Sequence, residues 1–139
     1  MLLEPETWKH RKQFRGRLKG KSHKWHRVAF GTYGMKAVSS GYLTSRQIES
    51  ARKVIVRYVR NIGKLWIRTF PDIPYTKLGL EMPMGKGKGE VASYRARVKR
   101  GRIVFEIDWV DKKTAQEAFR QAAYKLPMNF KLVEKWEIL

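Results

Sequence analysis

The segment from residue 44 to residue 64 most constrains the fold, because its two sides have opposite chemistry. Thr44 and Gln47 form a capping-box pattern that predicts the start of a helix, and Gly63 predicts its end. One side of this helix is apolar at helical spacing, and it consists of Ile48, Ala51, Ile55, Tyr58, Val59 and Ile62. Because a helix of this length depends on burial of its apolar side, the chain must supply a core to cover it.

The opposite side of the same helix is basic. At about 100° per residue its bases fall within a band of about 60°. A basic face that is merely solvated normally includes acids for i,i+4 pairing, whereas this one has only Glu49. We therefore predict that the face binds a row of phosphates. Its members are Arg46, Lys53, Arg57, Arg60 and Lys64.

Alternation of apolar and polar residues predicts strands on both sides of this helix. Residues 71–74, with two prolines, predict a turn. Residues 91–100 and 103–109 alternate on either side of Gly101, which predicts a hairpin with one buried face. The expected strands cover short pieces of residues 28–42, then residues 64–70, 77–82, 91–100, 103–109 and 130–136.

A second helix is predicted from Asp111, a suitable N-cap, to Leu126, with Pro127 just beyond its end. Its apolar stripe includes Ala115 and Phe119. Two helices packed on an antiparallel or mixed β-sheet give an α+β fold. A length of 139 residues suits one domain, which we place at residues 28–139 after a basic N-terminal arm at residues 1–27.

Charge is distributed very unevenly along the chain. The formal net charge is +19, and residues 1–102 hold 25 bases against 6 acids. The last 37 residues hold 6 of each and are neutral. So large an excess in one region implies a strongly anionic partner, with nucleic acid as the simplest choice and a membrane surface as the next.

The arm carries the densest charge. From residue 9 to residue 27 it has no acid and few apolar residues, so we expect an irregular segment that is ordered mainly by phosphates. Trp8, Phe14 and Trp25 could stack on unpaired nucleotides, but Trp25 equally suits a residue that opens the first strand and anchors the arm. The candidate phosphate ligands are Lys9, Arg11, Lys12, Arg15, Arg17, Lys19, Lys21, Lys24 and Arg27.

Residues 84–89 alternate glycine and lysine after Met84. Glycine permits backbone conformations that other residues resist, so this loop can bring bare backbone and the charges of Lys86 and Lys88 close to a polyanion. It is not a nucleotide-binding P-loop, because both lysines are followed by glycine and not by Ser or Thr.

Other functions find little support in the sequence. No apolar run is long enough to span a bilayer, and the basic helix lacks the bulky apolar anchors of a membrane-surface helix. No secretory h-region follows Met1, and the chain has no cysteine for a disulfide or a thiolate metal site. His23 and His26 lack a third metal ligand nearby. We therefore expect no metal, no cofactor and no small-molecule substrate.

A catalytic carboxylate pair is also not expected. Glu106 and Asp108 lie on one face of a predicted strand, but cross-strand ion pairs with Arg97 and Lys99 explain them better than acid–base chemistry. No nucleophile has an identifiable base, so the sequence does not predict an enzyme.

Four blocks of sequence resemble, in order, the bacterial-type (bacterial or organellar) large-subunit ribosomal protein sixteen family. They are residues 29–38 (AFGTYGMKAV), 43–52 (LTSRQIESAR), 63–72 (GKLWIRTFPD) and 84–89 (MGKGKG). The resemblance continues through residues 101–106 and 115–127 and so covers nearly the whole chain.

This resemblance implies a compact α+β domain that is a structural constituent of the large ribosomal subunit, in the bacterial cytoplasm or in a mitochondrial or other organellar matrix. The implied partners are large-subunit rRNA near the peptidyl-transferase centre, A-site tRNA and neighbouring ribosomal proteins. Peptide-bond chemistry belongs to the rRNA, which makes the chain a non-enzyme. The arm and the basic helix face correspond to rRNA-binding surfaces.

By position, the loop of the family near the tRNA acceptor arm corresponds to residues 82–89. Members commonly carry Arg where this chain has Pro83, so a guanidinium is lost and the start of the loop is stiffened. A non-ribosomal RNA-binding regulatory protein would show the same charge distribution and is the alternative. The loop residues are Met82, Pro83, Met84, Gly85, Lys86, Gly87, Lys88 and Gly89.

Overall fold

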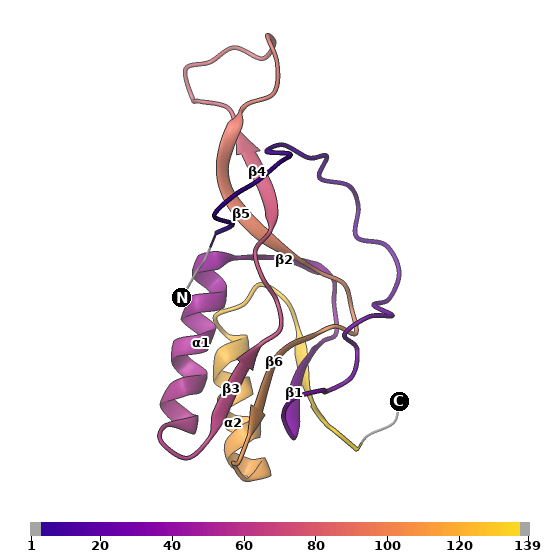
Figure 1. The fold of residues 1–139 in the computed structure, drawn as a ribbon, viewed down its shortest axis with the longest axis vertical. Coiled ribbons are helices and arrows are strands. Elements are labelled where there is room, and N and C mark those ends of the chain that lie inside the picture. Colours follow the sequence, from indigo (N-terminus) through magenta and orange to yellow (C-terminus); the bar gives the residue numbers. More distant parts are fainter. Residues whose placement is uncertain (1–3, 137–139) are drawn as a thin grey trace.

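A computed structural model describes residues 4–136 of the chain (Figure 1). In that part the protein has two helices and seven strands, so the predicted α+β class is confirmed. The helices are α1 (Ser45–Val59) and α2 (Lys112–Ala123). The strands are β1 (Tyr33–Ala37), β2 (Gly41–Thr44), β3 (Lys64–Ile67), β4 (Ile73–Lys77), β5 (Glu90–Val98), β6 (Ile103–Asp108) and β7 (Phe130–Glu134).

The strands form two antiparallel sheets, where the sequence predicted one sheet. The orders are β3-β6-β1-β7 and β2-β5-β4. The predicted hairpin between residues 91–100 and 103–109 is wrong, because β5 and β6 belong to different sheets. At Gly101, whose φ is 92°, the chain passes from one sheet to the other. The alternation of apolar and polar residues shows which face of a strand is buried, but it does not show which strand is its partner.

Two predicted boundaries also differ from the structure. The turn predicted at residues 71–74 does not extend over all four residues, because β4 begins at Ile73 and contains Pro74. Proline is tolerated there since β4 is an edge strand with a partner on one side only. The expected strand at 77–82 is wrong beyond Lys77, and β3 ends at Ile67, before the predicted end at residue 70.

The capping box of α1 is confirmed. The Thr44 hydroxyl accepts a hydrogen bond from the Gln47 amide at 3.2 Å, and the Gln47 side chain accepts one from the Thr44 amide at 3.0 Å. The helix ends at Val59, before the predicted Gly63. Ile62 therefore lies past the helix and is 79% exposed, so its assignment to the apolar face was wrong. Tyr58, assigned to the same face, is also exposed.

Helix α2 begins at its predicted cap, Asp111, which accepts a hydrogen bond from the Thr114 amide at 3.2 Å. Hydrogen bonds from the Thr114 side chain and backbone lower the pKa of Asp111. The helix ends at Ala123, and Leu126 is buried beyond it. Trp136, which was placed in the last strand, lies outside β7 and is exposed.

The helices pack against each other and against both sheets, and their apolar sides meet in one hydrophobic core. Leu43 of β2 and Val98 of β5 join Phe105 and Ile107 of β6 in this core, and all four side chains are fully buried. The two sheets therefore share one core. Charged side chains of α1 and of the three-stranded sheet are left on the outside.

Glu106 is buried and does not form the predicted cross-strand pair with Arg97. Its carboxylate accepts hydrogen bonds from the backbone amides of Phe30 at 2.6 Å and Gly31 at 2.9 Å, and it pairs with Arg68 at 2.7 Å. The backbone at Gly31 runs so close to β6 that an added Cβ would lie 2.5 Å from the Ile107 carbonyl oxygen. Glu106 thus fastens the chain before β1 onto β6.

The predicted pairing of Asp108 with Lys99 is wrong for the same reason, the absence of a β5–β6 ladder. Asp108 instead accepts hydrogen bonds from the Thr32 hydroxyl and from the Trp109 amide. Both carboxylates of β6 therefore stabilise contacts within the fold. Neither of them pairs with a basic side chain of β5.

Candidate nucleic-acid interface

The arm runs as irregular chain along the three-stranded sheet and then down to β1 (Figure 1). Backbone hydrogen bonds hold its second half on the body. The Ser22 amide donates to the Arg100 carbonyl at 2.9 Å, and the Ile103 amide donates to the Trp25 carbonyl at 2.9 Å. The arm thus has contacts of its own with the body, besides any that phosphates would supply.

Trp25 fulfils part of its expected structural role. It does not open a strand, since β1 begins at Tyr33, but its carbonyl anchors the arm to β6. Its ring is 54% exposed and lies next to Arg102, whose guanidinium carbon is 4.7 Å from the ring centroid. Trp8 packs edge-on against Tyr94, and Phe14 is exposed.

The arm meets the start of β5 and the glycine-lysine loop, about 75 residues away in sequence. Lys12 donates to the Lys88 carbonyl at 3.1 Å and pairs with Glu90 at 3.4 Å. Lys88 in turn donates to the Gln13 carbonyl at 2.7 Å, with its ammonium nitrogen 5.5 Å from the Phe14 ring centroid. The structure therefore joins two of the three basic segments into one surface.

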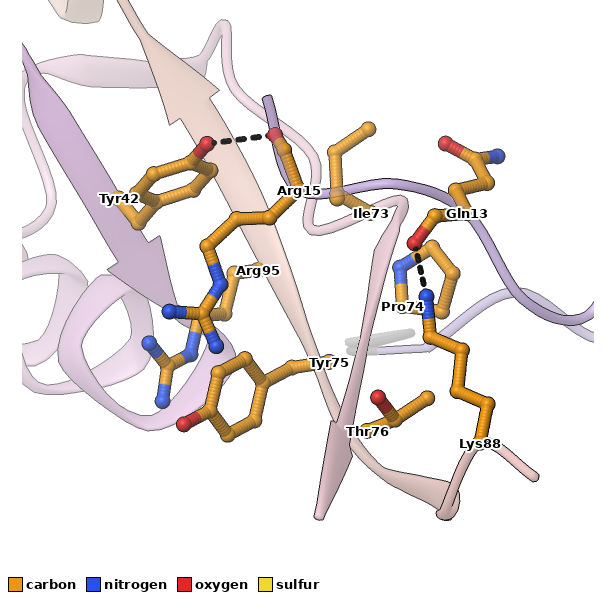
Figure 2. Close-up of a pocket in the computed structure, with 9 residues that line it drawn as sticks. All are labelled: Gln13, Arg15, Tyr42, Ile73, Pro74, Tyr75, Thr76, Lys88 and Arg95. Carbon is orange, nitrogen blue, oxygen red and sulfur yellow. Dashed lines mark hydrogen bonds between the residues drawn. The ribbon is translucent and has the colours of Figure 1, made fainter. Parts of the chain in front are cut away.

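A pocket at this junction gathers bases around a tyrosine (Figure 2). The guanidinium carbons of Arg15 and Arg95 lie 4.8 Å and 3.7 Å from the Tyr75 ring centroid. The Arg15 carbonyl accepts hydrogen bonds from the Tyr42 hydroxyl at 3.0 Å and from Arg97 at 3.1 Å. The Tyr75 ring thus contacts both guanidiniums, and neither forms an ion pair with a carboxylate of residues 4–136.

Only part of the predicted basic face lies on helix α1. Arg46, Lys53 and Arg57 are exposed on α1, but Arg60 is its C-cap and Lys64 is the first residue of β3. The acid Glu49 pairs with Arg52 at 2.5 Å, and this hydrogen bond lowers the pKa of Glu49. Glu49 therefore does not neutralise the predicted row of bases.

All fourteen candidate phosphate-binding bases are exposed. Within residues 4–136 only one of them, Lys12, forms an ion pair with a carboxylate. Internal pairing therefore accounts for almost none of the charge on this surface.

The loop at residues 78–89 lies at the far tip of the ribbon formed by β4 and β5 (Figure 1). Gly85 and Gly87 have φ values of 132° and 104°, which disfavour any residue with a side chain, and Lys86 has a φ of 58°. Met82 and Met84 are exposed. The loop thus presents its lysines and its backbone to solvent at the point farthest from the helices.

The sequence prediction missed a set of arginines. Arg95 and Arg97 were assigned to the polar face of residues 91–100, but Arg97 was given an acidic partner that the structure does not supply. Arg68 and Arg102 carried no prediction, although both lie beside the arm. The alternation along β5 was a usable signal for Arg95 and Arg97, whereas Arg68 and Arg102 are brought to this site by tertiary contacts alone.

Residues 4–136 contain no group of three or more His, Asp or Glu residues that could hold a metal ion. They also contain no helix of the length and apolarity needed to cross a membrane.

Fold and surface together define a small α+β protein of the polyanion-binding class, with exposed and unneutralised bases on an arm, a helix and a projecting loop. Residues 5–133 match the family model described as ribosomal protein L16p/L10e. The chain belongs to this family, whose members are structural ribosomal proteins and not enzymes.

Bacterial relatives extend the match over almost the full length. The chain is 50% identical over 132 residues to the large ribosomal subunit protein uL16 of Christiangramia forsetii, which covers 95% of each chain. The uL16 protein of Thermosipho africanus is 50% identical over 137 residues, covering 99% of this chain and 96% of the relative. That of Leptospira biflexa is 49% identical over 134 residues, covering 96% and 98%.

Proposed function

We propose that this chain is a structural constituent of the large ribosomal subunit and binds large-subunit rRNA. The observation that carries the proposal is the set of fourteen exposed bases, of which only Lys12 has an acidic partner within the described residues. Bases on such a surface bind RNA favourably because they release the counterions condensed on its phosphates. Membership of a ribosomal protein family and relatives named as large-subunit proteins support ribosomal RNA as the partner. The ribosome is accordingly its location, in a bacterial cytoplasm or an organelle.

The rRNA-binding surface in this proposal consists of the arm, the bases of α1 and the two bases that follow it. The arm supplies Lys9, Arg11, Arg15 and its remaining bases along one irregular segment. Arg46, Lys53 and Arg57 supply a separate row on α1. Because these rows belong to different elements, they can contact phosphates of different RNA segments and hold those segments in a defined relation.

The loop at residues 82–89 has a different role in the proposal. It approaches the peptidyl-transferase centre and helps to position A-site tRNA. Its support is its place at the tip of the β4–β5 ribbon, its exposure and the backbone freedom of Gly85 and Gly87. With Pro83 at its start, the loop makes this approach with Lys86, Lys88 and backbone. Neighbouring ribosomal proteins are further partners.

Co-sedimentation tests the assignment against the alternative of a non-ribosomal RNA-binding regulator. Lysate containing a tagged full-length chain is separated on a sucrose gradient in moderate salt, and each fraction is probed for the tag. We expect the chain to migrate with large subunits and to persist there when ribosomes are split into subunits. Recovery at the top of the gradient, while other large-subunit proteins sediment, would refute the ribosomal assignment.

A further inference from the structure

A second cavity, which we call the arm cavity, lies between the arm and the body. Its walls come from residues 21–25, from Phe30, from residues 67–73 and from three bases, Arg97, Lys99 and Arg102. Its volume of about 670 Å³ falls within the range of roughly 300–1,000 Å³ that ligand-binding sites occupy. The sequence prediction included Lys21, Lys24 and Trp25 as arm residues that could contact RNA, but it did not place them around a cavity with residues of the body.

The cavity concentrates positive charge that the fold does not neutralise. Arg68 pairs with the buried Glu106, but Asp72 is the only carboxylate among the described residues that line the cavity. The Nε atoms of Arg97 and Arg102 are buried and have no hydrogen-bond partner within the described residues. An arrangement of this kind favours the binding of an anion.

Arg102 shows most directly why the cavity favours an anion. Its terminal nitrogens donate to the carbonyls of Arg97 at 2.8 Å and of Arg68 at 3.2 Å, which orient the guanidinium without cancelling its charge. Burial lowers the pKa of Arg102, the charge of Arg68 lowers it further, and Asp72 opposes these effects. A phosphate within reach of this guanidinium would relieve the cost of its desolvation.

Aromatic rings border the same charges. Trp25 is 54% exposed and held at a φ of 57°, unusual for a bulky residue, by the hydrogen bond from Ile103 to its carbonyl. Phe30 is 58% exposed and stacks on Trp66 with a centroid distance of 6.3 Å. Exposed rings beside guanidiniums suit the flat face of a nucleobase and its phosphate together, whereas a phosphate alone would need only the cations.

We propose that the arm cavity binds one unpaired RNA nucleotide, with its base stacked on Trp25 and its phosphate held by Arg102 and Lys99. The inference rests on the proposed function, since it takes the partner to be RNA. It adds that one nucleotide leaves its helix and enters the protein. Because residues 21–25 form one wall, the bound nucleotide also holds the arm against the body, which supplies the other walls.

The test uses the isolated full-length chain and follows the indole N–H signal of Trp25 by NMR, assigned from its loss in Trp25→Phe. The probes are a single-stranded RNA hexamer without secondary structure, a duplex RNA of the same length and inorganic phosphate. We expect the hexamer to shift the Trp25 signal in a saturable way, and the duplex and phosphate to leave it nearly unchanged. Equal shifts from all three probes would reduce the cavity to a phosphate site and overturn the inference.

Variants measure how much the cavity contributes to binding. The double variant Lys24→Gln with Trp25→Leu should bind the hexamer about tenfold more weakly, as expected for the loss of one stacked base. Its matched control is Tyr124→Leu with Lys125→Gln, which removes the same charge and an exposed ring from the neutral part of the chain. The control should bind as the wild type does. Equal affinity of the two double variants would overturn the proposal.

Lys24 and Trp25 are both exposed, so their replacement removes little buried contact, and thermal unfolding of each variant checks this. Phe30→Leu provides a second cavity variant that leaves the arm unchanged, and it too should weaken hexamer binding. Failure of this proposal and failure of the proposed function give different results. A chain that binds the hexamer through Trp25 but never sediments with large subunits refutes only the ribosomal role. A chain that sediments normally and shows no Trp25 shift refutes only the nucleotide site.

Discussion

Glu106 shows how one buried charge can organise a fold that carries a large excess of positive charge. Its carboxylate is completely buried, pairs with Arg68 and accepts backbone hydrogen bonds from the chain just before β1. A buried carboxylate is tolerable only when its lone pairs are satisfied and a cation is close, and both conditions hold here. Arg68 also donates to the Arg27 carbonyl at 2.6 Å, so the same pair reaches the end of the arm.

We predict that Glu106→Gln destabilises the protein by about 3 kcal/mol, since removing one member of a buried ion pair leaves the other uncompensated. The new amide group would also face the backbone N–H groups of Phe30 and Gly31. Urea unfolding followed by circular dichroism measures the effect. The matched control is Glu90→Gln, at an exposed pair with Lys12, which should change the free energy of unfolding by less than about 0.5 kcal/mol. Similar midpoints for the two variants would show that Glu106 is not the anchor we describe.

Among the elements, the β4–β5 ribbon with its loop is the one whose form depends most on glycine. Gly85 and Gly87 adopt positive φ in open space, and an added Cβ at Gly89 would lie 2.7 Å from the Lys77 carbonyl oxygen. The loop is therefore narrow at its base and unconstrained at its tip. Lys88 points back to the arm, where it donates to the Gln13 carbonyl at 2.7 Å, so the two lysines of the loop are not equivalent.

Replacement of both Lys86 and Lys88 with Ala should weaken A-site tRNA occupancy more than it weakens subunit assembly. We expect about a tenfold loss of tRNA affinity, since a hydrogen bond to a charged group contributes about 1.5 kcal/mol. Filter binding of aminoacyl-tRNA to ribosomes that carry the variant measures the loss, and sucrose gradients measure assembly. Lys125→Ala, in the neutral part of the chain, serves as the control. Normal tRNA binding together with defective subunits would reverse the roles assigned to loop and arm.

The single variants separate the two lysines. Lys88→Ala should also loosen the arm, because it breaks the contact with Gln13, whereas Lys86→Ala should affect tRNA alone. Limited proteolysis of the isolated chain distinguishes them, since only the Lys88 variant should expose the arm to faster cleavage.

At the scale of the whole molecule, the distribution of charge separates two kinds of surface. Residues 103–139 are neutral by sequence and supply β6, α2 and β7, which form much of the core. The first 102 residues supply the arm, α1 and the β4–β5 ribbon, which carry the exposed bases. One part of the molecule thus stabilises the fold while the other presents charge, and binding through the second should depend steeply on salt.

Replacing Lys53 and Arg57 of α1 with Gln should reduce the slope of log Kobs against log[salt] by about 1.5 for binding to large-subunit rRNA. Each lost phosphate contact removes about 0.7–0.9 from the slope. Filter binding between 50 and 200 mM salt, roughly the range over which such contacts act, measures the slope. Lys113→Gln with Lys125→Gln removes the same charge from the neutral part and should leave the slope unchanged. An equal change in both variants would mean that only net charge matters.

The sequence was most informative where structure depends on neighbouring residues. The capping box at Thr44, the N-cap at Asp111 and most of the apolar face of α1 were predicted correctly, because hydrogen bonds and periodicity within a few turns depend on local chemistry. The exceptions on that face are Tyr58 and Ile62, which are exposed. Helix ends were less accurate, since Arg60 rather than Gly63 closes α1. The family resemblance extended the reading to the loop and the arm, and the family is confirmed.

The sequence did not predict which strands pair with each other. The period of two places Glu106 and Arg97 on faces of their strands, but it cannot reveal that β5 pairs with β2 and β4 while β6 pairs with β1 and β3. The hairpin and its ion pairs were wrong for this reason, and the arm cavity went unseen, because Trp25, Arg68 and Arg102 meet only after both sheets have formed.

By itself, then, the sequence determined that this protein is an α+β ribosomal-family chain with a basic arm, a two-sided helix and a glycine-lysine loop. Composition, local capping and periodicity are properties of the chain that hold before any long-range contact exists. Only the tertiary structure decided that the arm lies against the loop through Lys12 and Lys88, and that half-buried arginines and exposed rings line one cavity. These arrangements depend on which distant segments share the core, and that choice is made by packing over the whole molecule.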